Sequence, residues 1–270
     1  MSKAIRIMLT VLLAVAVAFP VLYAFSASFF SVVDFTDSYA HLLPSSLSLR
    51  NYALAISHRH FPRYIFNSVL TSTAISVLRL AVSVPAAFAL SHLSFRWKRL
   101  LFGLLASTLF IPSDAILYEN YSTIASLGLL DTYAAIILPS IFSAASILML
   151  YGAFASRNRD VYDAARIDGA GDLRYMAQIL VPLSAPFAAT ILIQSFITSF
   201  NSYLWPLIVT NRDSMRTVQI GLTMLGFAEE GEKGAMFAAV MIVTIPFLAL
   251  LAAGRKTIMK ALVNQEDNTI

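Results

Sequence analysis

The sequence predicts an all-α membrane protein with six transmembrane helices, and three observations lead to that prediction. Of the 270 residues, 58% are hydrophobic and only 13% are charged, whereas about 25% of the residues in a soluble protein are charged. Apolar runs long enough to cross a bilayer, which takes about 20 residues, recur from one end of the chain to the other. The connections between these runs are polar, and basic residues concentrate in alternate connections.

The six apolar segments expected to span the bilayer are separated by polar connections. They comprise residues 7–30, 65–90, 100–117, 132–154, 179–209 and 235–254. The first could be a signal peptide, because Ala24 and Ser26 are small residues at cleavage spacing, but its length favours a retained span. The fifth contains Pro182, Pro186 and Pro206, which predict breaks or kinks.

Because the apolar segments follow one another closely, no room is left for a separate soluble domain. We expect residues 1–63 to form the first transmembrane helix and an outer connection, residues 64–260 the membrane core, and residues 261–270 a cytoplasmic tail. With the N-terminus inside, the inner segments contain twelve Lys and Arg residues and the outer segments six. This bias predicts that both termini and a loop at residues 156–178 are cytoplasmic.

The composition and motifs also exclude several kinds of site. The absence of cysteine excludes disulfides, thiol catalysis and cysteine-bound metals. His58 and His60 lie in a polar connection, where solvated loop residues are a better interpretation than a metal site, so no metal or cofactor is expected. The phosphate-binding motif G-x-x-x-x-G-K-[ST] is absent. We therefore do not expect an enzyme, and ATP hydrolysis would require separate subunits.

The most polar segment lies between the fourth and fifth expected spans. Residues 157–174 contain eight charged side chains, and at about 3 kcal/mol per charge at the bilayer centre this segment must lie in water. Val161, Ala164 and Ala165 share one face of a short helix, and the glycines at 169 and 171 predict a sharp turn. Asp172 is then expected to cap a second helix, whose apolar side holds Leu173, Met176, Ala177 and Leu180.

This loop resembles the EAA loop of binding-protein-dependent ABC importers, in which Glu-Ala-Ala is followed by Asp-Gly-Ala and then by Ile-x-Leu-Pro. The spacing matches throughout, with Asp163 in place of the usual Glu and Val181 in place of the usual Leu. The resemblance implies that an ATPase subunit docks on this loop. The residues implied to take part are Asp163, Ala164, Ala165, Asp168, Gly169, Ala170 and Gly171.

Other stretches resemble the smaller six-span permease subunit of maltose-type carbohydrate importers. Residues 199–210, SFNSYLWPLIVT, resemble the end of the fifth span in that family, and residues 127–133 resemble the connection before the fourth. The pairs Asn67-Ser68 and Phe95-Arg96, at the ends of the second span, fit as well. The similarity covers nearly all of the chain from about residue 50 onward, although the usual tail Gly-Ala-Val-Lys-Gly is absent.

By this resemblance, the chain has the type I ABC importer permease fold and lies in the cytoplasmic (inner) membrane of a prokaryote. Its implied cargo is a mono- or oligosaccharide or a related polyol compound such as glycerol-3-phosphate. The implied partners are a second homologous permease subunit, two ATPase subunits, an extracytoplasmic solute-binding protein and the lipid bilayer, but no nucleic acid. The outer loop at about residues 211–234 would touch the binding protein.

Candidate substrate-path residues combine aromatic faces with hydrogen-bonding groups. Those near the outer end of the fifth span are Asn201, Tyr203 and Trp205, and the weaker candidates are Glu119, Asn120 and Tyr121. Tyr203 and Trp205 equally fit an aromatic belt at the membrane interface. Arg79 lies inside the second span and would suit a phosphate. Alternatively, it pairs with a neighbouring carboxylate or extends to a packed interface.

Three alternatives stay open at this point. A permease for amino acids or peptides would share the EAA loop but lack the stretch at residues 199–210. A non-transporting membrane scaffold would bind no ATPase and enclose no polar cavity. An intramembrane enzyme would need polar catalytic residues in facing spans, and the sequence offers no such set.

Overall fold

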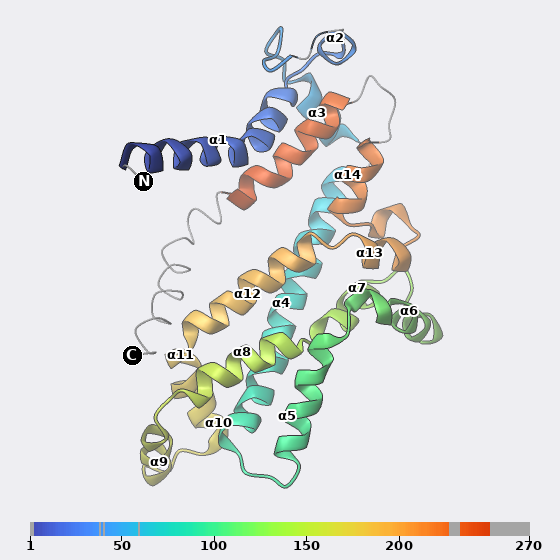
Figure 1. The fold of residues 1–270 in the computed structure, drawn as a ribbon. Helices are drawn as coiled ribbons and strands as arrows, with labels where there is room; N and C mark the ends of the chain where they lie inside the picture. The colour runs from blue at the N-terminus through green and yellow to red at the C-terminus, as the bar shows by residue number, and fades with distance from the viewer. Residues whose placement is uncertain (1–2, 38, 40, 59, 227–232, 249–270) are drawn as a thin grey trace. The chain divides into compact units, whose positions relative to one another are not determined.

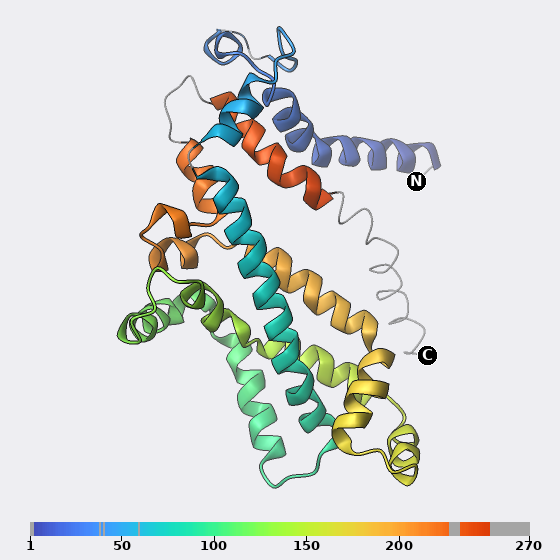
Figure 2. The ribbon, with the colours of Figure 1, turned by 180° about the vertical axis from the view of Figure 1, so that it is seen from behind.

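The computed structural model describes residues 3–37, 39, 41–58, 60–226 and 233–248, and Figures 1 and 2 show its helices from two opposite sides. Helices and turns make up this described part of the chain, which contains no β-strand. The prediction of an all-α protein is therefore confirmed. The end of the sixth expected span and the expected tail at residues 261–270 lie outside the described residues.

The chain divides into two compact units. The first combines Met1–Ile65 with Val218–Ala253, and the second consists mainly of Phe66–Thr217. In the first unit, the Asn51 amide donates hydrogen bonds to the main-chain carbonyls of Ser28 and Phe30, at 3.0 and 2.8 Å. The helices of this unit are α1 (Lys3–Ala27), α2 (Val32–Thr36), α3 (Arg50–Ser57), α14 (Val218–Gly226) and the apolar helix Lys233–Leu248.

The second unit is assembled around the long helix α4 (Phe61–His92), which begins in the first unit. Its other α-helices are α5 (Lys98–Ser107), α6 (Leu117–Ser126), α7 (Tyr133–Ile141), α8 (Ala144–Ala155), α9 (Arg159–Ile167), α10 (Asp172–Tyr175), α11 (Val181–Leu183), α12 (Ala185–Phe200) and α13 (Leu204–Val209). Short 3-10 turns lie at η1 (Thr108–Phe110), η2 (Ser113–Ile116) and η4 (Asp213–Met215), and a π-helical turn lies at η3 (Met176–Leu180).

Within the described residues, two helices are long and apolar enough to cross a membrane, Ile5–Ala27 and Phe61–His92. Two bent pairs raise the number to four if each pair forms one span. The pair α7 and α8 bends by 44°, and the segment Asp172–Leu183 meets α12 at 80°. The count of six spans therefore stays a prediction.

Three of the expected spans are not continuous helices, and one of them, the fourth at residues 132–154, is divided at Phe142 between α7 and α8. The expected third span, residues 100–117, breaks after Ser107 because Pro112 disfavours a helical conformation at Ile111, which is extended at φ −88° and ψ 116°. The expected fifth span, residues 179–209, breaks at Ser184 between Pro182 and Pro186. The break that the sequence predicts from Pro182 and Pro186 is therefore present.

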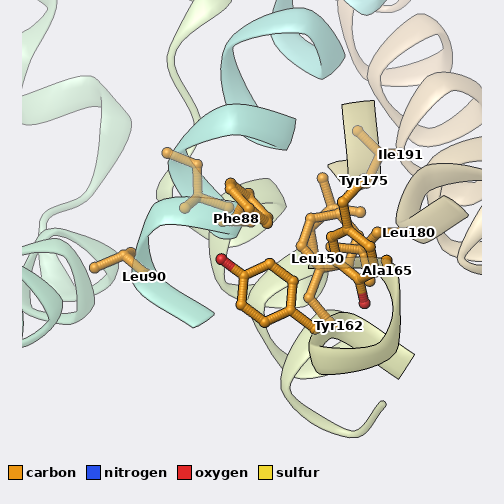
Figure 3. Close-up of a cluster of buried hydrophobic side chains, with 11 residues drawn as sticks. Phe88, Leu90, Leu150, Tyr162, Ala165, Tyr175, Leu180 and Ile191 are labelled. Atoms are coloured by element: carbon orange, nitrogen blue, oxygen red, sulfur yellow. The ribbon is translucent and has the colours of Figure 1, made fainter. Parts of the chain in front are cut away.

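The core of the second unit joins α4 to α8, α9, α10 and α12. Its largest fully buried side chains include Tyr175, Phe154, Leu150 and Leu180 (Figure 3). Side chains of this size make many close van der Waals contacts, and such packing holds helices together in a membrane. The core therefore fixes the charged segment α9–α10 against the end of α4.

The two ends of the second unit differ in composition. Figures 1 and 2 show α9 at one end and α6 and α13 toward the other. The α9 end carries the charged loop at residues 156–178, and the other end carries the polar connections around Asp131 and Arg212. A unit with polar connections at opposite ends of an apolar core suits a membrane, where each end faces water.

Candidate coupling loop and substrate path

The charged loop contains a helix with defined signals at both ends. The side chain of Asn158 caps α9 by accepting a hydrogen bond from the main-chain N–H of Asp160 at 3.1 Å. At the other end, the N–H of Ala170 donates to the carbonyl of Ala165 at 2.9 Å, and Gly169 has a φ of +80°. This is a Schellman motif, which favours glycine because only glycine adopts a positive φ at no steric cost. The predicted sharp turn is present at Gly169.

An aromatic cluster attaches this helix to the end of α4. The ring of Tyr162 lies 4.9 Å from that of Tyr175 and 5.2 Å from that of His92, and the ring of Phe88 lies 5.2 Å from His92. Figure 3 shows Phe88, Tyr162 and Tyr175 grouped between α4 and the loop. The two pairs of Tyr162 meet edge-on and the Phe88–His92 pair is stacked, and aromatic pairs contribute about 0.5–1.5 kcal/mol each beyond their buried area. The cluster therefore links α9 directly to the longest helix of the unit.

Hydrogen bonds connect the two arms of the loop. The hydroxyl of Tyr162 donates to Oδ1 of Asp172 at 2.7 Å, and the guanidinium of Arg166 lies over the Tyr162 ring at 5.7 Å. The hydrogen bond to Asp172 and burial raise the pKa of Tyr162 above its usual value. The hydroxyl therefore remains a proton donor throughout the neutral range, and it holds α9 and α10 together.

Most of the predicted docking residues are accessible. Ala165 is buried and Ala170 is half-buried, so these two small side chains face the core. The remaining five are exposed and are Asp163, Ala164, Asp168, Gly169 and Gly171. Two apolar side chains that the sequence analysis did not single out are also on this surface, Ile167 at 87% exposed and Leu173 at 75%. A docking partner would meet both carboxylates and apolar groups.

The apolar residues predicted on the two arms of the loop divide between the surface and the core. Val161 and Ala164 are exposed, where another protein can approach them, and the inward face of α9 consists of Tyr162 and Ala165. The spacing from 162 to 165 is also helical, and the tyrosine buries more apolar area than Val161 would. In the second arm, Leu180 is buried, whereas Leu173 and Ala177 are exposed.

The role expected for Asp172 also differs. Asp172 is the first residue of α10, and Gly171 occupies the capping position. The Asp172 carboxylate instead accepts the hydrogen bond from Tyr162.

Arg79 binds the broken region of the α7–α8 pair. Its Nε and Nη2 both donate to the main-chain carbonyl of Ser140, with Nε 3.0 Å away, and Nη1 donates to Oγ of Ser195 at 3.3 Å. Ser140 lies in the last turn of α7, and Phe142 is extended, so the carbonyls there lack intrahelical partners. Arg79 supplies donors to one of them and connects α4 to α7 and α12. These partners differ from the carboxylate that the sequence analysis considered.

The expected substrate-path residues differ in what surrounds them. Trp205 and Tyr121 pack in a hydrophobic cluster with Ile124, Ala135 and Val209. The indole N–H of Trp205 donates to the carbonyl of Ala135 at 3.1 Å. A ring packed in this way helps to hold α13 against α6 and α7, and its polar group is not free for a ligand.

The other candidates are more accessible. Asn201 and Glu119 are exposed, Asn120 is half-buried and Tyr203 is 39% exposed. The amide of Asn201 donates to the carbonyl of Ile197 at 2.9 Å.

An apolar cavity of about 410 Å³ lies in the first unit, and its lining includes Phe19, Tyr23 and Phe29. Almost no polar group lines it, so it does not suit a ligand that is rich in hydroxyls. Within the described part of the chain, no group of three His, Asp or Glu side chains could hold a metal ion.

Comparison with known proteins places this arrangement in a family. The family model described as "Binding-protein-dependent transport system inner membrane component" matches residues 2–259. The sn-glycerol-3-phosphate transport system permease protein UgpE of Rhizobium meliloti (strain 1021) is 32% identical over 261 residues, covering 93% of each chain. The protein of the same name from Brucella abortus (strain 2308) is 31% identical, covering 98% of this chain and 97% of its own.

The fold has an experimentally determined counterpart. It is the crystal structure of a bacterial ABC transporter involved in the import of the acidic polysaccharide alginate, with a TM-score of 0.85 and 25% sequence identity. The match covers 95% of this chain and 98% of that chain. The type I importer permease fold is therefore confirmed, and the chain belongs to the family of inner membrane components of binding-protein-dependent transport systems.

Proposed function

We propose that this chain is a permease subunit of an ATP-driven importer whose cargo is a carbohydrate or a polyol phosphate such as glycerol-3-phosphate. The observation that supports this most strongly is the similarity over nearly the whole chain to permeases named for sn-glycerol-3-phosphate transport. The structural likeness to a transporter involved in the import of an acidic polysaccharide also supports a carbohydrate cargo. Both kinds of cargo combine hydroxyl groups with negative charge.

The ATPase subunit docks on the exposed surface of the loop around α9. This surface combines the carboxylates of Asp163 and Asp168 with the apolar side chains of Ile167 and Leu173. Its attachment to α4 through Tyr162 and Tyr175 supports a coupling role, because a displacement of α9 is passed to a helix that crosses the unit. The chain itself hydrolyses no ATP, since it lacks a phosphate-binding loop.

The loop at residues 156–178 lies in the cytoplasm together with both termini, and residues 64–260 form the membrane core. The excess of Lys and Arg in the inner segments supports this orientation. In the same orientation the end with α6 and α13 faces outward, where a solute-binding protein delivers the cargo. A second, homologous permease subunit and two ATPase subunits complete the importer.

The substrate-path candidates divide into residues with accessible polar groups and residues that hold helices together. Tyr203, Glu119 and Asn201 keep accessible polar groups and stay as candidates, together with the half-buried Asn120. Trp205, Tyr121 and Arg79 make contacts that hold helices together, which supports a structural role for them instead. The cargo then passes between this chain and the second permease rather than through a pocket in one subunit.

A thermal-shift screen of the cognate solute-binding protein tests the cargo class. Binding of the correct solute raises the melting temperature, and a concentration of about 100 Kd stabilises the protein by about 2.7 kcal/mol. We expect a shift with a sugar or a polyol phosphate. A shift with amino acids or peptides alone would contradict the proposal and support the alternative importer class.

A further inference from the structure

A basic and aromatic turn joins α4 to α5, outside the loop to which the proposed function assigns the ATPase. This α4–α5 turn runs from Ser94 to Trp97 and leads directly into the first turn of α5. Phe95 and Trp97 are 38% and 57% exposed, and Arg96 between them is exposed as well. Figures 1 and 2 show the turn at the end of the second unit that carries α9.

Hydrogen bonds hold the α4–α5 turn in one shape. The Nζ of Lys98 donates to the main-chain carbonyls of Ser91 and Leu93, at 3.3 and 3.0 Å. These carbonyls lie at the C-terminal end of α4, where a helix leaves acceptors without intrahelical partners. The N–H of Leu101 donates to the carbonyl of Trp97 at 2.9 Å, on the other side of the turn. Lys98 is therefore engaged with its own chain.

Arg96 lies against an aromatic ring. Its Cζ is 5.4 Å from the centroid of the Trp97 ring, which is within the range of a cation–π contact. Such a contact occupies none of the N–H donors of the guanidinium, so they remain for an acceptor. Tryptophan is enriched at the interface between a membrane and water, where lipid headgroups lie. The pair therefore combines an anion-binding group with a residue that suits the depth of the headgroups.

The charge of this segment is positive and is not balanced along the chain. Residues 93–113 contain Arg96, Lys98 and Arg99 but no Asp or Glu. Among the ion pairs of the described residues, none includes Arg96. The group that complements this surface is therefore an anion from outside the chain.

An exposed apolar face adjoins the basic turn. α4, which ends just before the turn, is long and apolar enough to cross a membrane. On α5, which has no buried residue, the side chains of Leu100, Leu101 and Leu104 are all exposed. In a bilayer these leucines would contact acyl chains, while the turn lies at the level of the headgroups. The surface therefore has the two parts, basic and apolar, that a phospholipid requires.

We infer that the α4–α5 turn binds an anionic phospholipid of the cytoplasmic leaflet, with Arg96 donating to the headgroup phosphate beside the Trp97 ring. The inference rests on the proposed function, which assigns the α9 end of the unit to the cytoplasm. A guanidinium binds a phosphate through two parallel hydrogen bonds, and the anionic lipids of that leaflet attract basic segments beside a transmembrane helix. Orientation of the chain by positive charge alone needs neither an aromatic ring against the arginine nor a turn fixed by Lys98.

Fluorescence quenching by brominated lipids tests the inference in the complete importer. The importer is reconstituted in mixed vesicles of phosphatidylglycerol and phosphatidylcholine, in which one lipid or the other is brominated. The quenching that is lost in Trp97→Phe is the signal of Trp97. We expect brominated phosphatidylglycerol to quench Trp97 more strongly than brominated phosphatidylcholine does. Arg96→Gln should lower the relative affinity for phosphatidylglycerol by about fivefold, as expected for one arginine near an anionic surface.

Two further variants serve as controls. Arg96→Lys keeps the charge and should keep most of the preference for phosphatidylglycerol. Arg212→Gln removes an exposed arginine at the other end of the unit and should leave the preference unchanged. Equal quenching of Trp97 by the two lipids would overturn the inference, as would an undiminished preference in Arg96→Gln. Quenching by neither lipid would show that a partner protein covers the turn, which would also overturn it.

Uptake by the same vesicles separates failure of the inference from failure of the proposed function. If the vesicles take up a sugar or a polyol phosphate with ATP and the binding protein, and Trp97 shows no lipid preference, only the inference is lost. If the vesicles take up no such cargo, the proposed function is lost whatever the quenching shows. Should Arg96→Gln fail to assemble, the two brominated lipids compared in the wild-type importer still decide whether the turn prefers an anionic lipid.

Discussion

At the scale of single residues, polar side chains within the second unit bind main-chain groups that are distant in the sequence. Arg79 donates to the carbonyl of Ser140, 61 positions away, and Asn67 donates to that of Arg216, 149 positions away. A main-chain carbonyl inside a membrane protein has no water to bond with, so an unpaired one costs several kcal/mol. Arg79 therefore allows the α7–α8 pair to break inside the unit, whereas Asn67 holds the polar turn at residues 211–216.

Tyr162 and Tyr175 form a matched pair for a test at this scale. Tyr162→Phe removes the hydroxyl that donates to Asp172, and we expect the loop to lose about 1.5–3 kcal/mol of local stability, because the lost bond involves a charged group. The buried hydroxyl of Tyr175 has no hydrogen-bond partner in the described part of the chain. Tyr175→Phe should therefore be neutral or slightly stabilising.

Hydrogen exchange over residues 159–176 measures both variants. Faster exchange in Tyr162→Phe and unchanged exchange in Tyr175→Phe is the expected pattern. Equal exchange in the two variants would show that the bond between Tyr162 and Asp172 does not hold the arms of the loop together.

At the scale of elements, breaks between helices are as informative as the helices. Pro182 and Pro186 flank the bend of 80° before α12. Gly169, in a Schellman motif, ends α9. Each break has a local cause that is readable in the sequence. Arg79 adds a cause from outside the segment, since it binds the end of α7 beside the bend of 44°.

Gly169 gives a prediction about the turn after α9. A Cβ at this position would meet no atom within 4 Å, so a substitution acts through the backbone alone. Gly169→Val forces a β-branched residue to a φ of +80°, at about 1–2 kcal/mol, and should reduce uptake while ATPase activity persists. Gly169→Asn is the control, because asparagine tolerates a positive φ. Uptake by the valine variant at the wild-type rate would rule out a coupling role for this turn.

Arg79 gives a second prediction, which separates a structural role from cargo binding. Arg79→Ala leaves the Ser140 carbonyl without its two donors, so the importer should lose about 1–3 kcal/mol of stability even without cargo. The melting temperature of the purified complex measures this loss, with Arg99→Ala at an exposed position of α5 as the control. An unchanged melting temperature, combined with a selective loss of uptake of phosphorylated cargo, would instead support a phosphate site.

At the scale of the whole molecule, the second unit has two polar ends with different tasks in the proposed importer. One end carries the loop with α9, and the other carries the Asn211–Arg216 turn. α4 extends between them, with Asn67 near one of its ends and His92 at the other. Events at the two ends are therefore connected by one continuous helix.

Charge reversal tests the assignment of the ATPase to one end. Asp163→Lys should reduce the amount of ATPase that copurifies with the complex severalfold, because an exposed carboxylate within the docking surface is replaced by a cation. Glu119→Lys, an equivalent reversal at an exposed residue of α6, should leave copurification unchanged. Equal recovery of the ATPase with both variants would remove Asp163 from the docking surface.

The sequence by itself determined the membrane class, the charged loop and its sharp turn at Gly169. These features depend on composition and on local spacing, which are visible in one short window of the chain. The tertiary structure decided which side chains those segments bury and which groups they bind. Tyr162 rather than Val161 faces the core, Trp205 is packed rather than free, and Asp131 binds a turn 80 positions away. Such outcomes depend on contacts between distant segments, so no local pattern in the sequence contains them.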